Sequence, residues 1–319
     1  MPPPPTDRLR FAHLSDMHLP IPGRPRPGDL LGKRLLGYIS WARKRRHWHK
    51  QDVSETLIAD MKDQGCEAAL LSGDVVNISL EAEFAAAEAF LARAFEGLPL
   101  LFCPGNHDAY VATAWELSLG QLGRFMAGVR IGDPARRPPR DAADFPYSVD
   151  LGPARLIAAN SSPPTAPGLA TGALGSAQIG RIEQELVAGA GRFRILMLHH
   201  PVTSGVVSRR KALDDRQALL AVLARTGAEL VLHGHAHVPS FAEIETPTGP
   251  APAIGGGALS HPQGHGRMTP GRYNLFTLER SARGFRLELE VRQYAPGAGG
   301  VASVERRVYE RPVTERASA

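Results

Sequence analysis

The sequence has few cysteines and no long hydrophobic run. Its 319 residues include only Cys66 and Cys103, which lie far apart, each beside or within an apolar run. We therefore expect two buried thiols in a reducing compartment rather than a disulfide framework. No apolar run approaches the ~18 residues of a membrane-spanning helix, and the initial MPPPPTDRLRF lacks the cationic and apolar blocks of a secretory signal. These absences predict a cytoplasmic protein.

Acidic residues are absent from one stretch, between Leu30 and Gln51, which holds seven Lys and Arg residues. The whole chain has 37 Lys and Arg against 32 Asp and Glu, so without this stretch the acidic residues would be in the majority. The basic character is therefore local. A local patch argues against a protein that coats nucleic acid, and we do not expect a nucleic-acid partner.

Short apolar runs alternate with helical patterns, which indicates an α/β fold. We expect strands at 8–15, 67–73, 98–104, 147–152, 154–160, 192–199 and 228–233. We expect helices at 52–64, 80–96, 176–190 and 214–226, three of them closed by Gly65, Gly97 and Gly227. After residue 240, period-two patterns predict antiparallel strands, whereas 132–146 reads as an irregular surface connection.

Side chains that can bind metals follow five of these runs at the point where each run ends. The segments are SDMHL, SGDVVN, CPGNHDAY, LHHPV and HGHAH. Because the carboxyl ends of strands in open α/β sheets form the ligand site, we expect these groups to meet. Taken singly, an Asp-x-His is usually a turn and a strand-end His is usually structural. Glycines 73, 105 and 234 fit tight turns with close backbone approach.

This ordered set of motifs resembles the calcineurin-like metallophosphoesterases, and within them a bacterial branch that includes cyclic-nucleotide and glycerophosphodiester phosphodiesterases. The matching motifs are Asp16-Met17-His18, Gly73-Asp74-Val75-Val76-Asn77, Gly105-Asn106-His107-Asp108, His199, and Gly234-His235-Ala236-His237. The resemblance spans residues 9 to about 280. It implies one domain over 1–319, built as a two-sheet β-sandwich flanked by helices in four layers, α/β/β/α.

The resemblance also implies a dinuclear metal centre. Asp16, His18, Asp74 and His237 would hold one divalent ion; Asp74, Asn106, His199 and His235 would hold the other, with Asp74 bridging. This set of nitrogen and oxygen donors suits Mn, Fe, Zn, Co or Ni, and it lacks the thiolates of a structural zinc site. In the family, a hydroxide that bridges the two ions attacks phosphorus in line.

Further polar residues have expected roles beside the ions. His107 would protonate the leaving group or stabilise charge on it, and Asp108 would either orient that ring or cap a helix. His200 would touch the substrate phosphate or fill a turn, and Asn106 would contact substrate as well as metal. His233 falls outside the family pattern, and we expect it to be structural.

The Pro/Gly-rich and basic segment 20–50 follows the first motif closely, so we expect it at the mouth of the site. From 33 to 50, apolar and aromatic residues interleave with cations, as in a basic amphipathic helix. Such a helix can bind an anionic membrane, steer an anionic substrate, or simply pack on the sandwich with a solvated face.

The sequence thus predicts a metal-dependent phosphoester hydrolase, and specifically a phosphodiesterase, that acts on a small-molecule or lipid substrate. Two alternatives stay open. One is a hydrolase of a lipid phosphodiester or pyrophosphate, located peripherally at the membrane surface. The other is a non-catalytic scaffold that keeps this fold for partner binding, as a retromer subunit resembling this family does.

Overall fold

The first of two mixed β-sheets joins the beginning of the chain to its end. The computed structural model describes residues 7–297 and 300–313. In this sheet the strand order is β14-β13-β12-β1-β2-β3. The strands are β1 (Arg8–Leu14), β2 (Ala68–Leu71), β3 (Leu100–Phe102), β12 (Arg272–Ser281), β13 (Gly284–Ala295) and β14 (Gly300–Arg311). β1, β2 and β3 run parallel, whereas β12 to β14 form an antiparallel meander beside β1.

The second sheet has the order β10-β11-β9-β8-β7-β6-β4-β5. Its strands are β4 (Gly128–Arg130), β5 (Asp133–Arg137), β6 (Tyr147–Leu151), β7 (Ala154–Ala158), β8 (Phe193–Met197), β9 (Leu230–His233), β10 (Ser240–Ile244) and β11 (Ala251–Gly255). The central strands β7, β8, β9 and β11 are parallel, and antiparallel strands form both edges.

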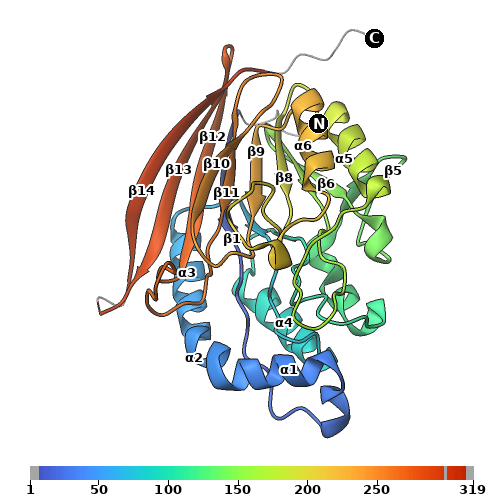
Figure 1. The fold of residues 1–319 in the computed structure, drawn as a ribbon. Coiled ribbons are helices and arrows are strands. Elements are labelled where there is room, and N and C mark those ends of the chain that lie inside the picture. The colour runs from blue at the N-terminus through green and yellow to red at the C-terminus, as the bar shows by residue number, and fades with distance from the viewer. Residues whose placement is uncertain (1–6, 298–299, 314–319) are drawn as a thin grey trace.

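The two sheets pack face to face, with helices outside both, as the sequence predicts (Figure 1). In β7, Leu156 belongs to the core between the sheets, whereas Ile157 packs under α5 (Ser176–Ala188) and α6 (Arg216–Thr226); β8 and β9 repeat this alternation. A strand buried on both faces must be apolar throughout, which explains its continuous hydrophobic run. On the other side lie α3 (Gln51–Asp63) and α4 (Glu81–Ala94). Within the described residues, no helix is long and apolar enough to cross a membrane.

A charged group fixes α3 to the first sheet. The Asp60 carboxylate accepts two hydrogen bonds from the Arg292 guanidinium on β13, at 2.6 and 2.7 Å, and one from the Tyr273 hydroxyl on β12, at 2.6 Å. Burial alone would raise the pKa of Asp60, but the bonds from Arg292 and Tyr273 outweigh it and lower that pKa. The folded state therefore favours the carboxylate over the neutral acid.

We expect Asp60→Asn to lower the free energy of unfolding by about 2–3 kcal/mol at pH 7, because it removes charge-assisted hydrogen bonds. Since the folded-state pKa is lowered, the wild-type stabilisation is present at neutral pH and disappears as the pH falls below about 4. Urea unfolding at several pH values measures both effects. The control is Asp63→Asn, at an exposed position of the same helix. If the loss of unfolding free energy in Asp60→Asn stays the same in acid, the ionised Asp60 carboxylate does not provide this stabilisation.

The predicted strands and helices are confirmed to within a few residues, but 132–146 is not an irregular connection. It contains β5 at the sheet edge, followed by a short 3-10 turn at Ala142–Asp144. Arg137 forms ion pairs with Asp133 at 2.9 Å and with Asp144 at 2.7 Å. Ion pairs rather than apolar contacts stabilise this edge hairpin. Its sequence therefore lacks the alternation of apolar and polar residues from which a strand is predicted.

The basic segment forms α1 (Lys33–Ser40), a π turn at Trp41–Arg45 and α2 (Arg46–Trp48), and lies across one end of the sandwich (Figure 1). One face points inward: Tyr38 and Trp41 stack at 5.7 Å and pack on a small apolar cluster that contains Ile78. Gly37 allows this approach, since a Cβ there would lie 2.7 Å from both Ile78 Cγ2 and the Tyr110 hydroxyl.

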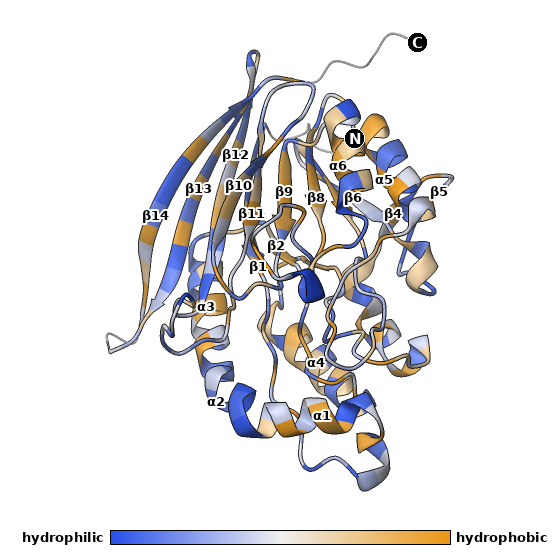
Figure 2. Cartoon of the chain, viewed as in Figure 1, coloured by the Kyte–Doolittle hydropathy of each residue, from blue (hydrophilic) through white to orange (hydrophobic). Residues whose placement is uncertain are grey.

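Hydrophobic and hydrophilic residues are mixed along this segment (Figure 2), and many of those on its opposite face are exposed. Exposed apolar side chains are Leu31, Leu35, Leu36, Ile39 and Trp48, with Leu31 at 76% and Leu36 at 58% exposure. Exposed cations are Arg43, Lys44, Arg46 and Lys50. Other cations anchor the segment: Arg34 donates to the Ser79 carbonyl at 2.6 Å, and Lys33 to Thr165 at 2.9 Å.

Candidate metal centre

Backbone strain concentrates at the residues expected to bind metal. Six non-glycine residues among those described have positive φ, and five of them belong to the expected ligand set. These five are Asp16 (55°), His18 (47°), Asp74 (60°), His235 (69°) and His237 (55°). The left-handed region costs an L-residue roughly 1–2 kcal/mol. Such strain persists where the surrounding structure imposes it, typically at functional sites.

The first group of donors surrounds the His18 ring. Its Nε2 atom lies 3.1 Å from Nε2 of His237 and 3.7 Å from Oδ2 of Asp74, and Oδ1 of Asp16 lies 3.1 Å from His237 Nε2. Asp16, His18 and Asp74 are buried, and Asp16 Oδ1 has no hydrogen-bond partner among the described residues. Carboxylate oxygens and ring nitrogens that converge in this way fit a divalent cation.

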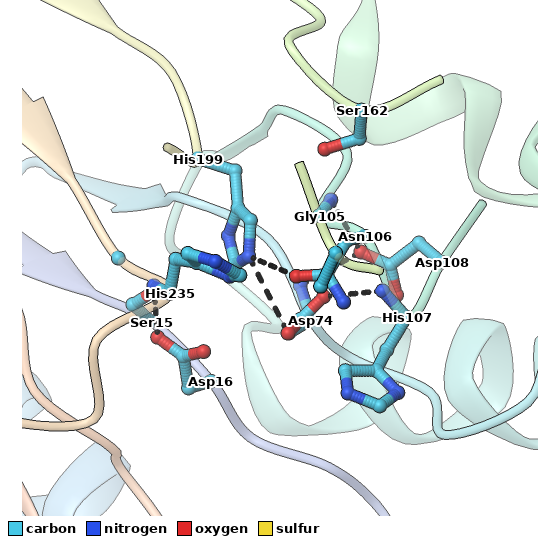
Figure 3. Close-up of polar contacts among 12 residues, drawn as sticks. Ser15, Asp16, Asp74, Gly105, Asn106, His107, Asp108, Ser162, His199 and His235 are labelled. Atoms are coloured by element: carbon cyan, nitrogen blue, oxygen red, sulfur yellow. Dashed lines mark hydrogen bonds and ion pairs between the residues drawn. The ribbon is translucent and has the colours of Figure 1, made fainter. Parts of the chain in front are cut away.

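The second group shares Asp74 with the first (Figure 3). Nε2 of His199 lies 3.4 Å from Asp74 Oδ2 and 3.1 Å from the Asn106 amide oxygen, and His235 completes the group. The same carboxylate oxygen therefore faces donors of both groups. This arrangement fits two neighbouring cations with Asp74 between them.

Backbone carbonyls select the ring nitrogen that each histidine offers. His199 Nδ1 donates to the Ser72 carbonyl at 2.7 Å, His18 Nδ1 to that of Val76 at 3.3 Å, and His235 Nε2 to that of Lys211 at 3.0 Å. In each ring this leaves the other nitrogen as the one that could bind a metal, as is usual around metal-bound histidines. Although burial lowers the pKa of His199, the Asp74 carboxylate raises it to about 9. A metal bound there displaces this proton.

The comparisons with known proteins agree with this geometry. A model of the family described as "Calcineurin-like phosphoesterase" matches residues 9–239. The chain belongs to the calcineurin-like phosphoesterases. The family uses a dinuclear divalent metal centre, and this chain has both donor groups for one. No curated protein sequence matches the chain significantly.

Solved structures of other phosphoesterase-fold proteins show the same fold at low sequence identity. Purple acid phosphatase PPD1 from yellow lupin (Lupinus luteus) seeds is 14% identical, with a TM-score of 0.59 over 98% of this chain. The match covers 55% of that phosphatase, so this chain spans only about half of its length. GAP50, described as the anchor in the inner membrane complex of Plasmodium, is 12% identical, with a TM-score of 0.50 over 97% of this chain and 90% of its own.

Asp108 connects the loops of this calcineurin-like phosphoesterase rather than orienting His107. Its carboxylate accepts four backbone N–H bonds, from Asp74 at 2.7 Å, Gly105 at 2.8 Å, Val75 at 2.8 Å and Val76 at 3.0 Å. Neither the expected contact with the His107 ring nor a helix cap is present among the described residues, because backbone donors already surround both oxygens. Gly105 is required beside it, since a Cβ there would overlap the Asp74 carboxylate.

His107 lies at the edge of the metal centre. Its backbone N–H donates to Asp74 Oδ1 at 2.7 Å, and its ring lies 4.8 Å from that of His18. Nδ1 of the ring donates to the Asn77 carbonyl at 2.6 Å, while an Arg45 nitrogen approaches both ring nitrogens, at 2.8 and 3.0 Å. Burial and the Arg45 charge together lower the pKa of His107 to about 3. The ring is therefore neutral in this state.

His200 is not placed to touch a substrate. It is fully buried, and its ring packs 4.5 Å from that of His235. Its Nδ1 bonds the Ser161 hydroxyl at 2.9 Å and its Nε2 donates to the Ala170 carbonyl at 3.3 Å, so both nitrogens have protein partners. His200 thus packs against His235, an expected metal ligand. His233 is also buried, with Nε2 3.3 Å from the Ser240 hydroxyl, in keeping with a structural role.

Sequence reasoning missed two residues of the basic segment, Arg45 and His49, which reach the centre. His49 is buried, with its ring 4.4 Å from that of His18. Its Nδ1 donates to the Ser260 hydroxyl at 2.7 Å, and that hydroxyl donates to the Asp16 carbonyl at 3.4 Å. His49 groups with His18 and His237 but not with the two carboxylates, so it supports the first site from outside. The spacing from Tyr38 to Trp41, Arg45 and His49 was the available signal, because it marks one helical face.

We expect His49→Ala to weaken metal binding about tenfold, because outer groups that position ligands typically contribute this much. Its bond through Ser260 holds the Asp16 loop. Calorimetric titration of the apoprotein with Mn²⁺ measures the effect. The control is His47→Ala, in the same segment but exposed. Wild-type Mn²⁺ affinity in His49→Ala refutes the supporting role.

Proposed function

We propose that this calcineurin-like phosphoesterase is a metal-dependent phosphodiesterase. The observation that carries the proposal is the position of Asp74 Oδ2, 3.7 Å from His18 Nε2 and 3.4 Å from His199 Nε2, where it belongs to both donor groups. Two divalent cations, when bound, would polarise a phosphoryl group and lower the pKa of a water molecule between them. The preference for a diester is supported by the resemblance of the motif set to the bacterial phosphodiesterase branch.

We assign the other residues of the site to metal binding, to the leaving group and to the phosphoryl group. Asp16, His18, Asn106, His199, His235 and His237 would complete the two donor sets around Asp74. His107 is assigned to the leaving-group side: Nδ1 bonds the Asn77 carbonyl, and Nε2, which lies 3.0 Å from Arg45 Nη1, would have to take up a proton before it could donate one to the leaving oxygen. Asn106, 7% exposed, can turn its amide N–H groups to the phosphoryl group while its oxygen faces the metal.

Metal analysis followed by a substrate panel tests the proposal. The apoprotein is loaded with Mn²⁺, Ni²⁺, Co²⁺ or Zn²⁺ and offered bis-aryl phosphodiesters, cyclic nucleotides and aryl phosphomonoesters. We expect uptake of two ions per chain and metal-dependent cleavage, with higher kcat/KM for diesters. Higher kcat/KM for monoesters contradicts the diester preference. Uptake of two ions without any hydrolysis favours the scaffold alternative.

An anionic membrane surface is a second proposed partner, and the outer face of the α1–α2 segment supports it. Exposed leucines and isoleucine on α1 lie next to the exposed cations Arg43, Lys44 and Arg46, a combination that suits the interface of anionic lipids. A lipid phosphodiester or pyrophosphate would then approach the metal centre from this surface.

Co-sedimentation with vesicles tests the membrane proposal. We expect binding to phosphatidylglycerol vesicles, weak binding to phosphatidylcholine, and loss after neutralising Arg43, Lys44 and Arg46 or after Leu35→Ser with Leu36→Ser. Arg45 is left intact because it points inward. The control is Val187→Ser, exposed on α5. Unchanged sedimentation of the neutralised variant removes the membrane argument.

A further inference from the structure

Arg45 differs from the other cations of its segment. Arg43, Lys44 and Arg46 are exposed, but the π turn at Trp41–Arg45 directs Arg45 toward the metal centre. There, Nη1 lies 2.8 Å from His107 Nδ1, and Nη2 donates to the Gly37 carbonyl at 3.1 Å. Its Nε is buried and has no hydrogen-bond partner among the described residues.

This guanidinium also lacks a carboxylate. Among the described residues its polar side-chain contacts are the His107 ring and the Gly37 carbonyl, and none is a carboxylate. Two other enclosed arginines do pair with carboxylates, Arg194 with Glu229 at 2.7 Å and Arg292 with Asp60. The buried Arg272 and Arg311, like Arg45, form no ion pair among the described residues, but both lie away from the donor groups. An enclosed cation beside a basic ring and backbone is poorly compensated, because a buried charge needs an opposite charge or a full set of hydrogen bonds.

Arg45 lies beside the loops that carry the expected metal ligands. Arg45 contacts the His107 ring, and the backbone N–H of His107 donates to Asp74 Oδ1. The other oxygen of this carboxylate, Oδ2, is the one that faces both donor groups. His107 therefore lies between the Arg45 guanidinium and the Asp74 carboxylate and contacts both. The His107 ring contacts Arg45 and lies 4.8 Å from the His18 ring, so an anion bound at the metal centre would lie near this guanidinium.

We propose that Arg45 binds a phosphoryl oxygen of the substrate that the metal ions do not hold; this inference rests on the proposed phosphoesterase function. The planar guanidinium offers two parallel donors to phosphate oxygens, which a lysine ammonium cannot do. On binding, Arg45 exchanges its contact with His107 for the phosphoryl oxygen and leaves His107 Nε2 free for the leaving group. The α1–α2 segment is then part of the active site.

Phosphate titration of the metal-loaded protein tests the inference without relying on turnover. Inorganic phosphate is the probe, calorimetry measures its Kd, and metal analysis accompanies each variant. We expect Arg45→Ala to raise the Kd for phosphate about tenfold or more, and Arg45→Lys to raise it by less, since the lysine keeps the charge but not the paired donors. The control Arg46→Ala, which removes the same charge from the neighbouring exposed position, is expected to bind phosphate like the wild type.

The outcomes separate this inference from the proposed function. Equal phosphate Kd values for the wild type and Arg45→Ala, both carrying two ions, overturn the role of Arg45 alone. A wild type that takes up metal but binds no phosphate overturns the proposed function, and the inference with it. Loss of metal from Arg45→Lys, which keeps the charge, shows that Arg45 stabilises the metal loops and also overturns the inference. If Arg45→Ala does not fold, the comparison of Arg45→Lys with Arg46→Lys decides the question.

Discussion

Replacing Asp74 by asparagine is expected to lower kcat/KM by about 10³-fold or more, since losing the charge stabilisation of even one cation costs several kcal/mol and each 1.36 kcal/mol is tenfold. Asp74 Oδ2 faces both donor groups, so the neutral amide would remove the negative charge that the two cations would share. Asparagine is the suitable replacement because Asp74 has φ 60°, a left-handed conformation that asparagine adopts more readily than most other non-glycine residues.

Steady-state kinetics, metal analysis and thermal denaturation together identify the cause of the Asp74→Asn effect. We expect weakened uptake of both ions and retention of the fold. Asp63→Asn removes an equal charge from the exposed end of α3 and should keep wild-type activity. An Asp74→Asn protein that binds two ions tightly and hydrolyses phosphodiesters at the wild-type rate excludes a bridging role for this carboxylate.

The three histidines of HGHAH are expected to differ sharply when each is replaced by asparagine. His235→Asn and His237→Asn should each lose activity by about 10²-fold or more, because each removes one ligand from a different donor group. His233→Asn should keep most of the activity, since this ring bonds the Ser240 hydroxyl and the Gly234 carbonyl away from the donor groups. Asparagine again suits the positive φ of His235 and His237.

Metal titrations give the matching readout for this series. His235→Asn should weaken one binding event and His237→Asn the other, whereas His233→Asn should titrate like the wild type. The three variants share one motif and one substitution, so a general effect of mutating this loop would affect them equally. Equal losses in all three would show that the loop as a whole, and not two particular imidazoles, determines the activity.

Strands buried on both faces could be predicted from the sequence, whereas exposed strands at the edge of a sheet could not. β8 and β9 are apolar because both faces are buried, and this pattern is visible without a structure. β14 was not predicted: most of its residues, including Val304 and Val308, are exposed, since it has a neighbour on one side only. Its VERRVYER segment carries little trace of burial, and only its pairing with β13 defines it.

The candidate site divides in a similar way. Residues such as Asp16 and His199 were predicted because their chemistry and order along the chain match a family pattern. Arg45 was not, because it is one of several adjacent cations and only the direction of the π turn separates it from Arg46. Asp108 was misjudged for a related reason: its backbone bonds reach Asp74 and Val76, more than thirty positions earlier in the chain. Contacts of that kind leave no local signature.

The donor groups come from both sheets, and this has a consequence for the architecture itself. Asp16, His18, Asp74 and Asn106 follow strands of the first sheet, whereas His199, His235 and His237 follow strands of the second. Each ion would therefore join the two halves of the sandwich at one end, as a disulfide joins two strands in a secreted protein. Alignment of the sheets and occupancy of the metal sites are thermodynamically linked, so whatever loosens one weakens the other.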